Sequence, residues 1–138
     1  MTYDLERFVT AQNQGGTYDR ALAELRRDRK TSHWMWFVFP QIAGLGMSAT
    51  SQHYAIGSLD EARAYLAHPV LGPRLTACSR VVADSSASAG QIFGGIDGQK
   101  LRSAMTLFGR ADPTEPVFGA VLDRCFEGAE DQATLDRL

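Results

Sequence analysis

Apolar residues recur along this chain at intervals of three and four positions, in segments separated by glycine, proline and serine. This spacing is typical of amphipathic α-helices. No hairpin signal joins two strand-like segments. The pattern predicts an all-α fold, in which residues 1–138 form a compact single-domain bundle of about eight short helices around a buried Trp/Phe-rich helix. The clearest apolar stripes are Leu5, Phe8 and Val9; Tyr18, Ala21, Leu22 and Leu25; Leu101, Ala104, Met105 and Phe108; and Val117, Phe118, Val121, Leu122 and Cys125.

The segment 34–40 has no polar side chain and contains both tryptophans of the chain. A segment that is apolar on all sides has to be enclosed by the fold. We predict a helix that is capped by Ser32 and ends before Pro40. A buried strand is the alternative, because Trp, Phe and Val favour sheets. The helix is favoured because a lone strand would leave its backbone groups unpaired.

Two further helix starts follow from capping residues. Ser58 and Glu61 have the spacing of a capping box, in which each side chain binds a free backbone amide at the helix start. Asp97 is expected to cap a helix over residues 98–110, after the Gly94-Gly95 pair. On the helix that begins near Thr17, Glu24 and the basic cluster 26–30 are expected to face water.

The composition is that of an ordinary globular protein, with 138 residues, 44% hydrophobic and 22% charged, and a formal charge of −2. These values argue against disorder and against a field that attracts nucleic acid or a membrane. No apolar run approaches the roughly 20 residues that span a bilayer, and the N-terminal residues lack a signal peptide pattern. We expect a cytoplasmic location, with Cys78 and Cys125 as free buried thiols.

None of the common enzyme signatures is present: there is no nucleophile elbow, phosphate-binding loop, paired-histidine zinc motif or dinucleotide fingerprint. No cofactor and no metal site is predicted, and the catalytic residues are unknown. The candidates are His33 and the pair Lys100 and Ser103, which stand one helical turn apart so that the lysine could take the proton of the hydroxyl. The alternative is that Lys100 is a surface residue and Ser103 a small residue at a helix contact.

A buried aromatic segment with polar residues at both ends suits a ligand pocket. Because Lys100 and Arg102 could meet anions, the expected partner is a small anionic molecule, phosphorylated or nucleotide-like. If the protein is an enzyme, hydrolysis of a glycosidic or ester bond fits better than redox chemistry. The predicted ligand-binding residues are His33, Trp34, Trp36, Gln41, Tyr54 and Arg102.

An ordered series of motifs runs through nearly the whole chain, at residues 33–41, 44–46, 54–56, 58–62, 68–75, 92–94, 100–103 and 105–108. This series resembles the domain of unknown function 1810 family (DUF1810) of small bacterial proteins. The resemblance implies an all-α fold and no particular activity. Some members carry a calpastatin-like label, but calpastatin is disordered and repetitive, and this chain is neither.

A more distant likeness concerns the segment 34–39 followed by His53 and Tyr54. It is similar to the aromatic elements of the NADAR family of ADP-ribose-linked N-glycosidases, although the acidic residues of a glycosidase lack clear counterparts here. Two other hypotheses stay open: a non-catalytic protein-protein interaction domain, and, less favoured, binding of nucleic acid through residues 26–30. The sequence leaves the oligomeric state open.

Overall fold

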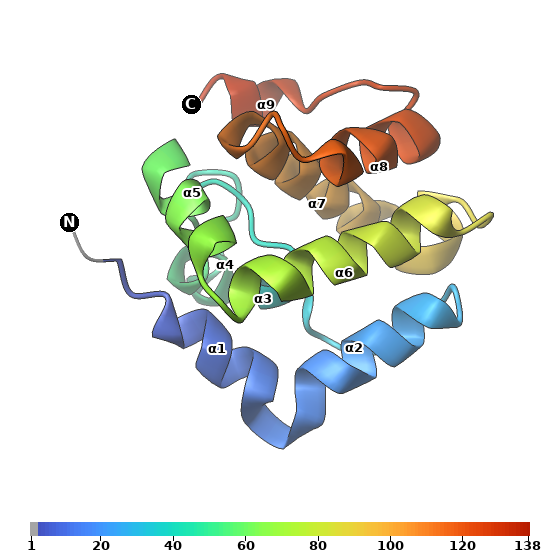
Figure 1. Cartoon of the computed structure of the whole chain (residues 1–138), viewed down its shortest axis with the longest axis horizontal. Helices are drawn as coiled ribbons and strands as arrows, with labels where there is room; N and C mark the ends of the chain where they lie inside the picture. Colours follow the sequence, from blue (N-terminus) through green and yellow to red (C-terminus); the bar gives the residue numbers. More distant parts are fainter. Residues whose placement is uncertain (1–2) are drawn as a thin grey trace.

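The computed structural model describes residues 3–138, and regular structure within them is helical (Figure 1). One isolated parallel bridge between Ile42 and Ile56 is the exception. The predicted all-α fold is confirmed. The elements are α1 Glu6–Asn13, a 3-10 turn Gln14–Gly16, α2 Thr17–Arg26, α3 Met35–Val38, α4 Ala49–His53, α5 Leu59–Ala67, α6 Leu71–Asp84, α7 Ala89–Ala111, α8 Pro116–Phe126 and α9 Gln132–Leu135.

The helix α7 is the central element of the bundle. It packs against α5, α8 and α9, while α6 packs against α2, α5 and α8. In Figure 1, α1 and α2 form a V on one side of the molecule, and α8 and α9 lie on the opposite side. The core is therefore enclosed between the N-terminal and the C-terminal helices.

Aromatic rings connect these layers through the interior. Phe8 of α1 meets Tyr65 of α5 edge-on, with ring centres 5.1 Å apart. Tyr65 lies 5.2 Å from Phe108 of α7, which lies 6.0 Å from Phe118 of α8. All four side chains are fully buried. Burial of a large aromatic side chain stabilises a fold by about 2 to 3 kcal/mol, so this series is a main source of stability.

The aromatic segment is helical, as predicted, but α3 covers only Met35–Val38. The predicted cap is wrong: Trp34 precedes the helix without a side-chain hydrogen bond, and the Ser32 hydroxyl instead donates to Glu24. The segment is also not enclosed on all sides, because Trp36 and Phe37 are only half-buried. A single helical turn at the edge of the core buries one side and leaves the other accessible.

Two of the capping predictions need correction. Ser58 caps α5 as expected, but the Glu61 carboxylate accepts from the Gly57 N–H at 2.8 Å, one residue before the position that a capping box requires. Asp97 does not cap a helix start, because α7 starts after Ser88, is interrupted only at Gly94 and is already helical again at Asp97. A complete capping box joins Ser88 and Gln91. This capping box was not predicted, because residues 84–90 are rich in serine and alanine and have the composition of a loop.

The two cysteines differ in burial. Cys78 of α6 is buried, and burial raises the pKa of its thiol to about 12. Cys125 of α8 is half-buried rather than buried, and burial raises its pKa as well. Because the thiolate is the reactive form, we expect a water-soluble alkylating reagent at mildly basic pH to modify Cys125 at least about tenfold faster than Cys78. Pulse alkylation followed by peptide mass spectrometry measures both rates, and equal rates in the folded protein would contradict this expectation.

Candidate functional site

Glu24 is a buried hub between α2 and α3, contrary to the expectation that it faces water. Its carboxylate accepts hydrogen bonds from the backbone N–H of Thr31 at 2.8 Å, from the backbone and hydroxyl of Ser32, and from the indole N–H of Trp34 at 2.9 Å. Burial by itself would raise the pKa of Glu24, but the hydrogen bonds from Ser32, Thr31 and Trp34 outweigh it and lower the pKa to about 2. This carboxylate therefore fixes Trp34 in the core.

The two tryptophans of the aromatic segment have different surroundings. Trp34 is fully buried and has its N–H bound by Glu24. Trp36 is half-buried and lines a cavity, and its indole N–H has no hydrogen-bond partner within residues 3–138. Of the two, only Trp36 is placed where it can touch a ligand.

Two adjoining cavities form a cleft along the loop 41–55: the smaller lies between the loop and Trp36 of α3, and the larger between the loop and α7. Their volumes are about 100 Å³ and about 480 Å³, and both are lined by Gln41, Gly46 and Ser51. The first is completed by Trp36, Ile42, Ala43, Gly44, Gln52, Tyr54 and Ala55. The second is completed by Leu45, Gly95, Ile96, Gln99 and Lys100. The larger cavity has the size of a small-molecule site, and the lining mixes apolar surface with a few polar groups.

The loop wall of the cleft is held at its two ends. The Ala43 N–H donates to the Ile56 carbonyl, and the Ile56 N–H donates to the Gln41 carbonyl, each at 2.8 Å. Between Ile42 and Ile56 no side chain is buried. Arg7 of α1 adds hydrogen bonds to the carbonyl groups of residues 53 and 55, both at 2.9 Å. The loop is thus positioned by these hydrogen bonds together with the partly buried Leu45 and Tyr54, which pack against the core.

Lys100 supplies the positive charge of the cleft. Its ammonium lies 5.0 Å from the centre of the Trp36 ring, within the range of a cation–π contact. The same ammonium is 3.5 Å from Asp97 Oδ1, and Asp97 Oδ2 is 2.9 Å from the ammonium of Lys30. One carboxylate is therefore shared by two ammonium groups, which leaves one positive charge unmatched within this trio.

Lys30 is an inner member of this trio, contrary to the expectation that the basic cluster 26–30 faces water. Its side chain is only 7% exposed, and its ammonium donates to the Ser32 carbonyl at 2.6 Å and lies 5.1 Å from the Trp34 ring. The Lys100 side chain is 22% exposed. Lys100 is therefore the accessible cation of the pair.

A break in α7 shapes the floor of the cleft. Gly94 has φ 79° and ψ 177°, which is not helical and which an L side chain rarely adopts. In a regular helix, Ile96 would lie on the same face as Ile92, four residues earlier. Ile92 is 2% exposed and Ile96 is 77% exposed. The break therefore turns Ile96 out of the core and into the lining of the cleft.

The structure brings four of the predicted site residues to the cleft: Trp36, Gln41, Tyr54 and Lys100. His33 is exposed and lines neither cavity. Of the other predicted residues, Trp34 belongs to the core, and Arg102 and Ser103 bind the segment before α9.

Arg102 and Ser103 attach this C-terminal segment to α7. The Arg102 guanidinium donates to the carbonyl groups of Ala129 at 2.9 Å and Glu130 at 2.8 Å. The Ser103 hydroxyl donates to the buried carboxylate of Asp131 at 3.1 Å, and no hydrogen bond joins Lys100 to Ser103 among the described residues. The geometry does not support Lys100 and Ser103 as a base and nucleophile pair.

Among the lining residues that sequence reasoning missed are Leu45, Ser51, Ile96 and Gln99. The glycines on either side of Leu45 were a signal for a loop, and a loop at the edge of a fold is a frequent place for binding residues. Ile96 gave no signal, since its exposure depends on the Gly94 backbone. Ser51 and Gln99 are ordinary polar residues on helices.

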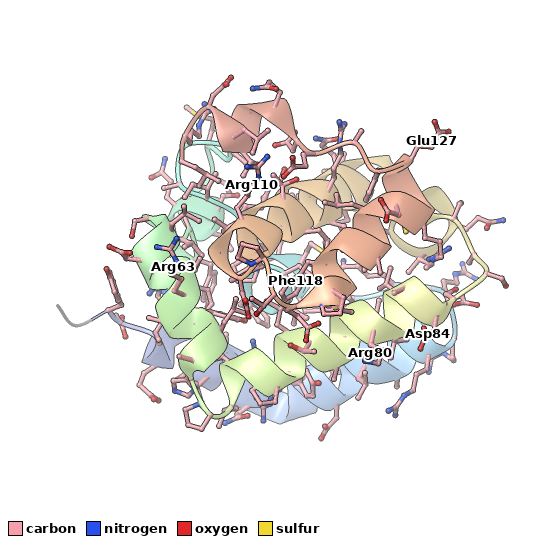
Figure 2. All side chains as sticks on the ribbon, turned by 45° about the horizontal axis from the view of Figure 1, so that its top comes forward. Arg63, Arg80, Asp84, Arg110, Phe118 and Glu127 are labelled. Atoms are coloured by element: carbon pink, nitrogen blue, oxygen red, sulfur yellow. The ribbon has the colours of Figure 1, made fainter. Side chains whose placement is uncertain are left out.

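Another cavity of about 480 Å³ lies between α7 and α8 and is lined in part by Arg110, Glu115, Asp123 and Glu130. Arg110 binds Glu130 through two hydrogen bonds of 2.7 Å, and this pairing raises the pKa of Arg110 and lowers that of Glu130. Figure 2 shows Arg110 beside the C-terminal segment. Because the Arg110 guanidinium is already paired with Glu130, this cavity is a weaker candidate for anion binding than the cleft.

Neither a metal cluster nor a membrane helix is found within the described part of the chain. Among residues 3–138, no three His, Cys, Asp or Glu side chains come together as a metal site requires. Over the same residues, no helix combines the length and the apolar character needed to cross a bilayer.

The fold and the cleft define a small all-α protein with one accessible lysine beside a half-exposed tryptophan. The family described as "protein of unknown function (DUF1810)" matches residues 2–138, and the chain belongs to this family. The predicted resemblance is confirmed. The chain is also similar to the conserved hypothetical protein Rv1873 from Mycobacterium tuberculosis, whose crystal structure shares 47% sequence identity and a TM-score of 0.95. The match covers 99% of this chain and 96% of that one. No curated protein matches the chain.

Proposed function

We propose that the cleft between the loop 41–55 and α7 binds a small anionic molecule. The observation that carries this proposal is the position of Lys100, whose ammonium lines the larger cavity, faces the Trp36 ring and shares Asp97 with Lys30. Lys100 is partly desolvated and shares its one carboxylate partner with a second cation. Such a cation interacts strongly with a bound anion. The exposed part of Trp36 and the apolar walls supply contact area. The free thiols Cys78 and Cys125 support a cytoplasmic location as part of the same proposal.

A second candidate function is protein-protein interaction through the same face. It is favoured by Met47 and Ile96, large hydrophobic side chains that are 84% and 77% exposed and belong to the loop and to α7. Large exposed hydrophobic side chains are a feature of interaction sites. A hydrolytic activity would require a general acid or base in the cleft, where Tyr54 and Lys100 are the titratable side chains of the lining.

The test is a thermal-shift screen against inorganic phosphate, ribose 5-phosphate, adenosine 5′-monophosphate (AMP) and ADP-ribose, followed by calorimetric titration of the wild type and the Lys100→Gln variant. A ligand at a hundred times its Kd should stabilise the folded state by about 2.7 kcal/mol. Lys100→Gln should weaken binding about 10- to 100-fold, because a hydrogen bond to a charged group contributes about 1.5 to 3 kcal/mol.

Arg80→Gln is the matched control, since it removes one positive charge from an exposed position on α6 (Figure 2). It should leave the affinity unchanged. If no compound of the panel stabilises the wild type, the small-molecule proposal fails and the interaction surface becomes the better candidate. If a compound binds the Lys100→Gln variant and the wild type equally well, the cleft is not its site.

A further inference from the structure

We infer that the ligand of the cleft is a nucleoside phosphate, with its flat base between Leu45 and Ile96 and its phosphate at Lys100. This inference rests on the proposed function and narrows it from small anions in general to anions that carry a planar, largely apolar ring. It follows from the size of the larger cavity, from the side chains on its two walls and from the polar groups at its edge.

The larger cavity offers more room than a lone phosphate occupies. Its volume of about 480 Å³ is many times that of a small ion. It also falls within the range of about 300 to 1,000 Å³ of sites that enclose drug-sized molecules. Because Lys100 is its only cationic lining residue, an anionic group can occupy one part, and the remaining volume needs a second, uncharged group.

Part of the lining is apolar and open. Leu45 of the loop and Ile96, one helical turn before Lys100 on α7, line the cavity together with Gly95, which has no side chain. A Cβ at position 95 would meet no other atom within 4 Å, so nothing else in the described structure fills the space above this glycine. Branched aliphatic side chains beside open backbone suit the face of a flat ring, which makes broad contact without needing hydrogen bonds.

Ile96 presents the largest exposed apolar side chain in the lining of this cavity. It is 77% exposed, and its exposure is set by the left-handed backbone at Gly94 rather than by chance placement on a polar helix face. The Gly94 break leaves the neighbouring Phe93 in the core and turns Ile96 toward the cavity. A ring stacked on Ile96 would remove this apolar surface from water.

Polar groups at the junction of the two cavities can bind the edge of a base or a ribose. Gln41 lines both cavities, and its side-chain amide forms no hydrogen bond within residues 3–138. An amide presents both a donor and an acceptor, which matches the mixed edges of bases and the hydroxyl groups of a sugar. Gln99 is less available, because its amide nitrogen donates to Asp131 at 2.9 Å.

The experiment compares AMP, ribose 5-phosphate and inorganic phosphate by calorimetric titration of the wild type, Ile96→Ser and Met47→Ser proteins. AMP should bind the wild type about tenfold or more tightly than ribose 5-phosphate, because apolar contacts of this size change affinity by that order. Ile96→Ser should weaken AMP binding about fivefold or more and leave ribose 5-phosphate unchanged. Met47→Ser is the control, since Met47 is 84% exposed and does not line the cavity, and it should change neither affinity.

The outcomes separate the two proposals. If ribose 5-phosphate binds as tightly as AMP, or if Ile96→Ser leaves AMP binding unchanged, the base does not lie on Ile96 and this inference is wrong, while the anion site remains. If none of the three compounds binds, this inference is wrong, and the proposed function fails as well when ADP-ribose does not bind either. Because Ile96 is exposed, its variant should unfold at the temperature of the wild type, which the same samples show by thermal melting.

Discussion

The Glu24→Gln variant is expected to be less stable than the wild type by about 3 kcal/mol at neutral pH, because Glu24 holds its hydrogen bonds as a buried anion. The carboxylate accepts from Thr31, Ser32 and Trp34 and is 1% exposed. Its pKa falls from the ordinary value of 4.5 to about 2. The difference between these two pKa values corresponds to about 3 kcal/mol of folding free energy.

The pH dependence of this effect has a defined direction. A carboxyl group with a lowered pKa in the folded state contributes its stabilisation in full above the unfolded pKa, and loses it as pH falls toward the folded pKa. The difference in unfolding free energy between wild type and Glu24→Gln should therefore be constant above about pH 5 and shrink between about pH 4.5 and 2. Urea unfolding followed by tryptophan fluorescence measures it.

Glu127→Gln is the matched control for this experiment, because Glu127 is exposed at the end of α8 and points away from the molecule (Figure 2). It should change the free energy of unfolding by less than about 0.5 kcal/mol. A Glu24→Gln protein as stable as the wild type at neutral pH, or a loss that does not depend on pH, would show that the charge of Glu24 does not hold this turn together.

The Gly72→Ala variant is expected to lose more than about 3 kcal/mol of stability, or to fail to fold, since a large loss of this kind comes from forcing an atom into filled space. Gly72 lies in the first turn of α6. A Cβ at this position would lie 2.1 Å from the Leu66 carbonyl oxygen and 2.9 Å from its carbon. Both atoms belong to the backbone of α5, so no side-chain rotation relieves the clash, and α6 would have to move away from α5.

Gly119→Ala is the control, because the same substitution is made in α8 where a Cβ meets no atom within 4 Å. This variant should be more stable than the wild type by about 0.5 to 1 kcal/mol, since alanine loses less backbone entropy than glycine on forming a helix. Chemical denaturation of both variants gives the comparison. A Gly72→Ala protein within about 0.5 kcal/mol of the wild type would mean that the α5–α6 contact is looser than the structure shows.

Much of this fold could be predicted from local sequence patterns. The apolar stripes identified the helices and most of the core, because burial of one helix face follows directly from the spacing of side chains. The aromatic segment was identified as the region of the site for the same reason. Its length and its cap were not, since a turn held by Glu24 from another helix cannot be read from the residues of the turn.

The site was predicted only in part because its charges and its shape depend on contacts between distant residues. Trp36, Gln41, Tyr54 and Lys100 were expected there, and the structure places them at the cleft. Lys30 lies within a basic run that looks solvated, yet it pairs with Asp97 of α7. The contribution of Leu45 and Ile96 required the path of the loop and the conformation of one glycine.

The bridge between Ile42 and Ile56 closes off residues 43–55 from the rest of the chain. These two parts differ in how far their sequences can change. The thirteen residues between them, 43–55, leave and return at neighbouring points. Leu45 and Tyr54, near the two ends of this stretch, pack against the core, while residues 47–53 between them do not. Surface excursions with adjacent ends tolerate changes in length and sequence. We therefore expect residues 47–53 to tolerate change while the flanking residues and the rest of the scaffold are kept. Lys100 and Trp36 would keep their positions, while changes in this loop would alter which ligand the cleft accepts.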